Sequence, residues 1–382
     1  MSSFDRTVID TFAQKLELNL PAVASLQSFL PVGFAGLGFR ASHLYADAAF
    51  WSAGIATFFD VRDIVDIHRE DGEHFQFEHD MQTALDSLVA DGNPTAPEEK
   101  AVLPASVHDI CSFYEHATLI PTRLQAKLSV SINKSRANTL RNACSDQDTA
   151  RLISCSGRGA SAWLTNPIWM PDYAFKFAIR LRLGLPLSDN LPITCPTCDY
   201  PLNTDPAHII ACRKAVGLNK SWRHVIRDFL VGCLHRAGIR AVTEALYYND
   251  AMPVPDIDVT FPCYDTELVD VRLTTPTCGS YVALGQSSLG VASFHERRKE
   301  RDYKSEVDRL HISFTPFVLE TFGAIADKAS AFIDRIVDNA VDAAPTLFSR
   351  DAFRSDIVNE LSITLQIGNA NVIRKMLKRH FV

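Results

Sequence analysis

The sequence predicts an α+β protein with a mostly helical N-terminal half, a small Cys/His module and a mixed sheet with flanking helices. The 382 residues are 47% apolar and 22% charged, which is typical of packed globular cores rather than disorder. Four Cys and His residues within 195–212 have the spacing of a metal site. Two runs within 256–273 alternate polar and apolar residues with the period of a β-hairpin. These patterns define the parts that follow.

The N-terminal half is predicted to be helical. Residues 1–60 form helices around a glycine-punctuated turn, and 61–160 form a helical linker region that begins acidic and becomes basic. Within it, 91–97 (Asp-Gly-Asn-Pro-Thr-Ala-Pro) has the composition of a linker. Three histidines of the acidic stretch have no Cys partner, and we interpret them as solvated rather than ligating: His68, His74 and His79.

The Cys/His cluster is the most specific local pattern in the chain. Its members follow the spacing C-x2-C-x9-H-x3-C and are Cys195, Cys198, His208 and Cys212. The first two form a tight knuckle, and the last two, four residues apart, share a helix face, so all can converge on one tetrahedral Zn²⁺. Four ligands leave no open position, which predicts a structural zinc. The alternative is unrelated buried thiols beside a core histidine, against which the polar loop 199–205 argues.

Two basic helices flank this cluster. The first, 175–186, ends at a Gly/Pro stop and is predicted to point its Arg residues outward, and the second, 220–230, has apolar positions at helical spacing. Arg forks match phosphate oxygens, so both helices suit nucleic acid, and a solvated basic face is the alternative. The candidate phosphate contacts are Arg180, Arg182, Arg223, His224 and Arg227.

The alternating runs predict two strands, 256–261 and 267–273, joined by a turn. Side chains alternate between strand faces, so Asp256 and Asp258 share one face of the first strand. Asp270 and Arg272 share one face of the second. The carboxylates then meet across the hairpin, while Val and Leu side chains go to a core. Facing carboxylates are destabilising unless a cation joins them, and hard oxygen ligands suit Mg²⁺, so the hairpin is a candidate magnesium site.

Bulk properties exclude several classes of protein. No apolar run approaches the roughly 18 residues of a spanning helix, and the N-terminus lacks a secretory signal, so we expect an intracellular protein with no membrane partner. Nine cysteines then indicate one metal site plus buried thiols, not a disulfide framework. The net charge of −7 is uneven, because acids crowd into 60–99 while Lys and Arg dominate 176–240. A protein with this overall negative charge can therefore still have a basic surface.

Taken in order, several short motifs resemble the C-terminal half of site-specific non-LTR retrotransposon proteins. They are Arg180-Leu-Arg-Leu-Gly-Leu, the Cys/Cys/His/Cys knuckle, Arg223-His224, Pro255-Asp256, Asp270-Val271 and Lys299-x-x-Asp302-Tyr303. The thirteen residues between the two Asp motifs, 257–269, match the family's spacing. The run 35–40 before an Ala-rich helix resembles the segment just past a reverse-transcriptase thumb. The resemblance covers roughly 33–323.

The resemblance implies a restriction-endonuclease-like fold and a division into five parts. These are a post-thumb-like helical segment 1–60, the helical linker region 61–160, the zinc knuckle and basic helix 161–228, the endonuclease domain 229–345 and a C-terminal helical tail 346–382. By the same resemblance, Asp256 and Asp270 hold Mg²⁺ and Glu244 reaches it from the preceding helix, with an exposed helix Glu as the alternative for Glu244. Lys299 stabilises the negative charge that develops at the scissile phosphate, and Tyr303 lies one helical turn after Lys299. The basic end of the tail is interpreted as solvated, with nucleic-acid binding as the alternative.

The implied function is a Mg²⁺-dependent DNA endonuclease module that nicks target DNA to prime reverse transcription, in the nucleus or otherwise the cytoplasm. Its partners would be target DNA and element RNA. The polymerase motif is absent, since Tyr45-Ala-Asp-Ala48 lacks the second Asp. Two positions depart from the family pattern: Arg272 replaces a Lys and serves only as an electrostatic stabiliser, and Asp302 reverses a charge.

Two other classes of function stay open on the sequence. The first is a zinc-dependent nucleic-acid-binding module with a decayed nuclease site. The second is a structural or interaction remnant that uses the acidic face of 60–99, against which the four intact knuckle ligands argue.

Overall fold

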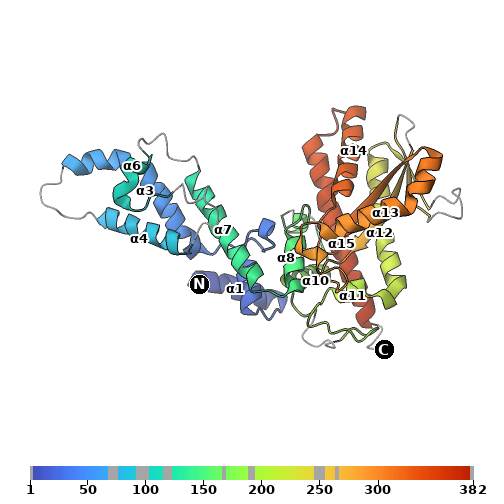
Figure 1. Ribbon diagram of the computed structural model, residues 1–382, viewed down its shortest axis with the longest axis horizontal. Coiled ribbons are helices and arrows are strands. Elements are labelled where there is room, and N and C mark those ends of the chain that lie inside the picture. The colour runs from blue at the N-terminus through green and yellow to red at the C-terminus, as the bar shows by residue number, and fades with distance from the viewer. Residues whose placement is uncertain are drawn as a thin grey trace. The chain divides into compact units, whose positions relative to one another are not determined.

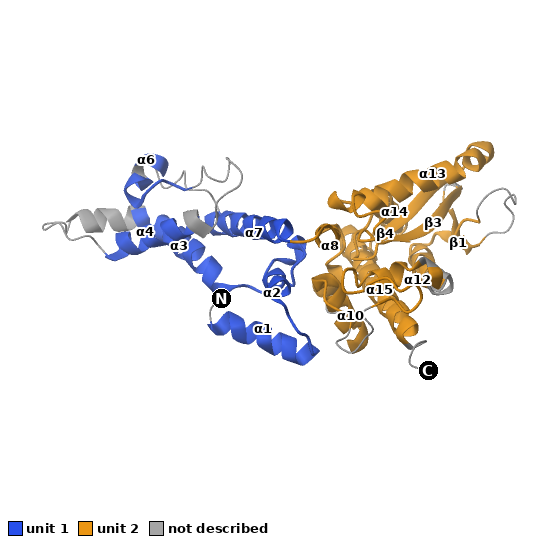
Figure 2. Ribbon diagram, turned by 60° about the horizontal axis from the view of Figure 1, so that its bottom comes forward, with its two compact units in different colours: residues 1–143 blue, residues 144–382 orange. Residues whose placement is uncertain are grey.

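The computed structural model describes residues 3–67, 76–91, 103–114, 123–165, 169–187, 194–244, 254–262 and 266–378. The chain divides into two compact units, 1–143 and 144–382 (Figure 2). This boundary falls inside the predicted linker region 61–160, and the three predicted parts from residue 161 onward lie together in the second unit. The five functional parts themselves stay predictions. His68, His74 and most of the predicted linker 91–97 lie outside the described residues.

The first unit is helical, as the sequence predicts. Its elements are α1 (Ser3–Leu16), α2 (Ala22–Ser28), η1 (Val32–Phe34), α3 (Ser42–Ile67), α4 (Gln76–Asp91), η2 (Val107–Asp109), α6 (Ile110–Tyr114) and α7 (Leu124–Asn142). Helices α3, α4 and α7 pack around a common core that includes Trp51, Met81 and Ile132. The Ala-rich stretch predicted as a helix is α3, and it carries Tyr45 on a helix rather than on a strand hairpin.

The second unit combines helices with one small sheet (Figure 1). The helices are α8 (Asp146–Cys155), α9 (Ala162–Thr165), α10 (Asp172–Leu183), α11 (His208–Ala211), η4 (Arg213–Ala215), α12 (Val216–Arg236), η5 (Leu284–Gln286), α13 (Gly290–Leu310), α14 (Asp327–Ala343) and α15 (Arg350–Lys378). The strands are β1 (Arg240–Thr243), β2 (Ile257–Thr260), β3 (Thr266–Thr274) and β4 (Ser313–Glu320). The α+β class and the mixed sheet are therefore confirmed.

The sheet has the order β1-β2-β3-β4, in which β1, β2 and β3 pair antiparallel and β4 pairs parallel to β3. The predicted hairpin is β2 and β3, with Ile257 opposite Val269. Its turn, 263–265, lies outside the described residues. The parallel β4 requires a crossover, which α13 supplies. The hairpin thus occupies the centre of the sheet.

Helices cover both faces of this sheet. On one face, Leu268 packs with Tyr303 of α13, whose ring stacks on Phe314 of β4 at a centroid distance of 4.3 Å. On the other face, Phe317 meets Phe332 of α14 edge to face. The buried positions of α14 recur at three- and four-residue spacing, which is why this amphipathic helix forms there. Leu268 therefore shares the carboxylate face of β3 and is fully buried in a core there, while Val269 and Val271 are buried on the opposite face.

One prediction about a helix is wrong. Residues 240–243 form the edge strand β1 rather than part of a helix, and Glu244 follows it with φ +48°. The predicted tail helix is α15, which is the central helix of the second unit and packs against α10, α12 and α14, while the basic residues Arg374 and Lys375 near its end are exposed. Its residues Ile357, Leu361 and Ile373 are at most 1% exposed. Among the helices of the described ranges, none is both long and apolar enough to cross a membrane.

Candidate metal centre and carboxylate pair

The four predicted zinc ligands lie together. The ligand atoms of Cys195, Cys198, His208 and Cys212 are all within 4.8 Å of one another. The Cys198 and Cys212 sulfurs are 3.7 Å apart, and the Cys198 sulfur lies 3.0 Å from His208 Nε2. Zn–S bonds of about 2.3 Å in a tetrahedron put two sulfurs about 3.8 Å apart, which the sulfur pair matches. The chemistry and spacing of the donors therefore fit a structural zinc.

Local backbone geometry makes this convergence possible. After Cys198, Asp199 adopts the left-handed conformation at φ +60°, and the chain turns so that the Cys195 N–H donates to the Tyr200 carbonyl at 2.7 Å. His208 begins α11 and Cys212 directly follows it, one turn later. The Tyr200 ring stacks on the His208 imidazole at 4.1 Å. Burial lowers the pKa of His208, which favours the neutral ring that a metal needs.

The cluster is attached to the body of the second unit at two points. Asp205 accepts hydrogen bonds from the Ala207 N–H at 3.1 Å and from the Thr277 hydroxyl, in the segment after β3, at 2.9 Å. Helix α11 packs against α15, and the Thr197 hydroxyl lies 3.9 Å from the sulfur of Met376. Loss of the cluster's structure would therefore disturb the central helix.

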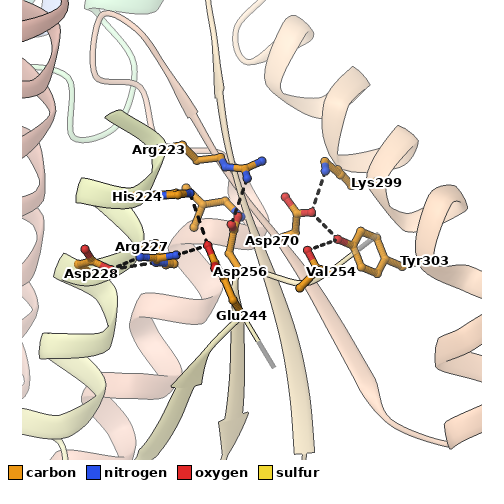
Figure 3. Close-up of polar contacts among 11 residues, drawn as sticks. Arg223, His224, Arg227, Asp228, Glu244, Val254, Asp256, Asp270, Lys299 and Tyr303 are labelled. Carbon is orange, nitrogen blue, oxygen red and sulfur yellow. Dashed lines mark hydrogen bonds and ion pairs between the residues drawn. The ribbon is translucent and has the colours of Figure 1, made fainter. Parts of the chain in front are cut away.

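The hairpin brings Asp256 and Asp270 together, as the alternation predicts. One step beyond the Ile257–Val269 pair, Asp256 comes opposite Asp270, and residues that face one another across antiparallel strands share a face. Both are buried, at 3% and 2% exposure. Figure 3 shows the two carboxylates between Arg223 of α12 on one side and Lys299 of α13 on the other. Asp258 is opposite Leu268 and takes no part in this pair.

Asp270 has one fully bonded oxygen and one free one. Its Oδ2 accepts from Lys299 Nζ at 2.7 Å and from the Tyr303 hydroxyl at 2.5 Å, so the predicted i, i+4 pair does reach it. Burial and the Asp270 charge raise the pKa of Tyr303, which keeps this hydroxyl a donor. The Oδ1 atom is buried and has no hydrogen-bond partner. A buried carboxylate oxygen without a protein partner is costly, so this atom is available to accept a cation or a water.

Asp256 is held from the backbone and by a cation. Its Oδ2 accepts from the Val271 N–H at 2.8 Å, and its Oδ1 lies 3.4 Å from Arg223 Nη2. Burial, and then the neighbouring Asp270, raise the pKa of Asp256. A divalent cation between the two would relieve both effects. Two buried carboxylates and one unsatisfied oxygen therefore fit Mg²⁺, which takes one or two carboxylates plus water or phosphate oxygens.

Further cations surround the pair. Arg272 lies on the face of Asp270, and burial, more than its positive neighbours Arg298 and Arg223, lowers the pKa of its guanidinium. Sequence reasoning missed His295, a neutral residue beside these cations on α13. It is buried, and burial together with Arg272 lowers its pKa to about 4, so the ring is neutral. The signal was its spacing, since His295, Lys299 and Tyr303 recur every four residues on α13.

Three predicted residues contact one another instead of the pair. Arg227 donates to Glu244 Oε1 at 2.7 Å and to Asp228 at 2.8 Å, and His224 Nε2 lies 3.6 Å from Glu244 (Figure 3). Glu244 is thus placed after a strand and engaged by α12, which corrects the prediction that it reaches the metal from a helix. Within the described ranges, the one group of three or more Cys, His, Asp or Glu ligands is the zinc cluster.

Arg180 and Arg182 do not point outward, which corrects a second prediction. They are 8% and 2% exposed. Arg180 donates to the Pro186 carbonyl at 2.7 Å, and Arg182 donates to the Ser161 hydroxyl at 2.9 Å. Both side chains therefore tie backbone segments together inside the second unit and are not available to phosphates. Asp302, the reversed charge of the family motif, is exposed on α13.

Comparison of the chain with protein-family models and with curated proteins finds no match.

Proposed function

We propose that the second unit is a restriction-like, Mg²⁺-dependent DNA endonuclease module of a non-LTR retroelement protein that nicks target DNA to prime reverse transcription. The observation that carries the proposal is the partnerless, buried Oδ1 of Asp270 beside the buried carboxylate of Asp256. Such a pair is stable when a cation joins it, and hard oxygen donors select Mg²⁺. The two short motifs that carry these residues also match the retroelement pattern in order and spacing.

In this proposal Asp256 and Asp270 hold the metal, which when bound polarises the scissile phosphate and lowers the pKa of an attacking water. The protein side chains have separate tasks. Tyr303 and Lys299 fix Oδ2 of Asp270, so that Oδ1 keeps its orientation. Lys299 is 19% exposed at its side chain, so its ammonium can also stabilise negative charge on a phosphate. Arg223 and Arg272 add positive charge on either side.

The arrangement of the sheet supports a restriction-like fold. The metal carboxylates lie on a central hairpin, and a parallel strand follows through a helix that carries Lys and Tyr. The zinc cluster, which we propose to be structural, holds α11 against α15 directly before α12 begins. Helix α12 then carries Arg223 to the sheet, where it pairs with Asp256 and could also contact a DNA phosphate.

The proposal is tested by nicking of supercoiled plasmid. We expect the full chain with zinc retained to convert plasmid to the open circle with Mg²⁺ and not with Ca²⁺. Asp270→Ala should lower the rate by on the order of 10²-fold or more, since even residues that only support metal ligands cost 10–100-fold. Asp342→Ala, an exposed carboxylate at the end of α14, is the matched control and should keep full activity. Wild-type nicking no faster than that of Asp270→Ala would refute the enzymatic function.

A zinc-dependent nucleic-acid-binding module with a decayed nuclease is the second candidate. The observation that favours it is that protein cations already hold both carboxylates, through the Arg223–Asp256 and Lys299–Asp270 ion pairs. Arg272 also replaces the expected Lys. DNA binding that weakens steeply with salt, without nicking by the wild-type chain, would decide for this function. Because target DNA and element RNA are both polyanions, the assay uses each in turn.

A further inference from the structure

A second candidate site lies on the outer side of α13. A groove of about 690 Å³ opens there, next to the start of β4, and its lining includes Phe294, Arg297, Arg301, Lys304, Val307 and Phe314. Small-molecule sites are typically about 300–1,000 Å³, so the groove is large enough for a ligand of nucleotide size.

The groove and the carboxylate pair occupy opposite sides of one helix. Lys299 and Tyr303, four residues apart, reach Asp270 from one side of α13. Arg297 and Arg301 precede them by two residues each, and two residues turn an α-helix by about 200°. The cations of the groove therefore point away from the carboxylates, and a ligand there would not compete for the metal site.

The groove has an uncompensated positive charge. Arg297, Arg301 and Lys304 are exposed, and among the residues that the structure describes they form no ion pair or hydrogen bond. Their spacing of four and three residues puts like charges side by side, which destabilises a helix unless an anion intervenes. Of the two acids in the lining, Glu300 pairs with Lys328 and Asp308 faces the cations, and outside the lining Arg297 also interacts electrostatically with Glu296, so positive charge remains in excess.

Two aromatic rings give the groove an apolar wall. Phe294 is half-buried and is fixed by the neighbouring rings of Tyr281 and His295, at centroid distances of 5.9 and 5.3 Å. Phe314 is stacked on Tyr303 on its other side. Unpaired bases stack on such rings while phosphates bind nearby cations, whereas duplex bases are already stacked on one another.

We propose that this groove binds a single-stranded segment of nucleic acid, with its phosphates on Arg297, Arg301 and Lys304 and a base against Phe294. The charge complementarity of three free cations selects a polyanion, and the aromatic wall selects one with accessible bases. The binding does not depend on cleavage at Asp270.

Fluorescence anisotropy with a fluorescein-labelled oligothymidylate, in Mg²⁺-free buffer with zinc retained, tests this site. Removal of three phosphate contacts in Arg297→Ala/Arg301→Ala/Lys304→Ala should lower the salt slope of log K by about 2 and the affinity at 0.15 M salt by on the order of 50-fold. Phe294→Leu keeps the apolar packing and should weaken binding by about tenfold. Arg6→Ala/Lys15→Ala, which removes exposed cations from α1, is the control for general charge.

Each outcome decides the proposal. Asp270→Ala should bind the oligonucleotide as tightly as the wild type. Loss of nicking activity can therefore be distinguished from loss of single-strand binding in the groove. Unchanged affinity in the triple variant would refute the groove, as would an equal loss in the α1 control. Duplex DNA or polyglutamate that competes as well as unlabelled oligothymidylate would refute the preference for single strands.

Discussion

Removal of zinc should destabilise the second unit as a whole and not merely the loop that carries the ligands. The cluster is bonded to the segment after β3 through Asp205 and Thr277, and it packs on the central helix α15. With zinc at 1,000 times its Kd, a site that exists only in the folded state contributes about 4 kcal/mol. The unit spans residues 144–382, for which the entropy of unfolding is about 0.5 kcal/mol per degree. Chelation should then lower Tm by about 8 °C.

Differential scanning calorimetry with and without a zinc chelator measures this shift, and metal analysis measures the stoichiometry. The first unit has its own core and no predicted ligand, so its transition should not move. Cys198→Ser should lose the metal and have the lower Tm even in zinc, while Cys278→Ser, a half-buried thiol outside the cluster, should behave as wild type. An unchanged transition after complete removal of metal would contradict the structural role, and equal zinc content in the two variants would contradict the ligand assignment.

Two further predictions concern residues inside the second unit. Arg182→Ala leaves a cavity and unsatisfied hydrogen-bond partners at Ser161 and Ala160, so chemical denaturation should show that the free energy of unfolding falls by about 2–5 kcal/mol. The salt dependence of DNA binding by the folded variant should equal that of the wild type. A weaker salt dependence would mean that Arg182 does contact a phosphate. The folded pKa of His295, about 4, lies below its unfolded value of about 6.5, so the unfolded state binds more protons between these values. His295 thus contributes stability that is complete above pH 6.5 and is lost as pH falls toward 4, with a slope of about 1.4 kcal/mol per pH unit. His295→Gln should flatten that slope and the exposed His235→Gln should not, and equal slopes in both variants would contradict the burial of the ring.

The zinc cluster and the hairpin could be predicted because their geometry is local. The four metal ligands converge because a tight turn joins Cys195 to Cys198 and one turn of helix joins His208 to Cys212. In the hairpin, side chains alternate between the two faces of a strand, so the sequence alone predicts on which face each carboxylate lies. The pairing of Asp256 with Asp270 then follows from the hairpin register alone. Lys299 and Tyr303 were similarly linked by their four-residue spacing, although their shared partner, Asp270 Oδ2, depends on a crossover that the sequence does not specify.

The errors have the opposite cause, since each depends on a distant segment. The helix that carries Arg182 has a polar stripe, but α15 packs against this helix and the segment 160–161 accepts the Arg182 hydrogen bonds. At Glu244, four residues of an edge strand are too few to establish a period of two, and the Ala and Leu that follow favour a helix.

The substitution at Arg272 limits which step of the proposed chemistry the chain can support. The guanidinium lies on the carboxylate face, where burial lowers its pKa, yet an Arg stays charged at any ordinary pH and cannot accept a proton from water. In the proposed chemistry its contribution would therefore be to hold a phosphate and to offset the charge of Asp270. Lys299 and Tyr303 both donate to Oδ2 of that residue. Because these two donors satisfy only Oδ2, Oδ1 stays open for the proposed metal, and the positive charge of Arg272 beside it would favour a phosphate bound together with that metal.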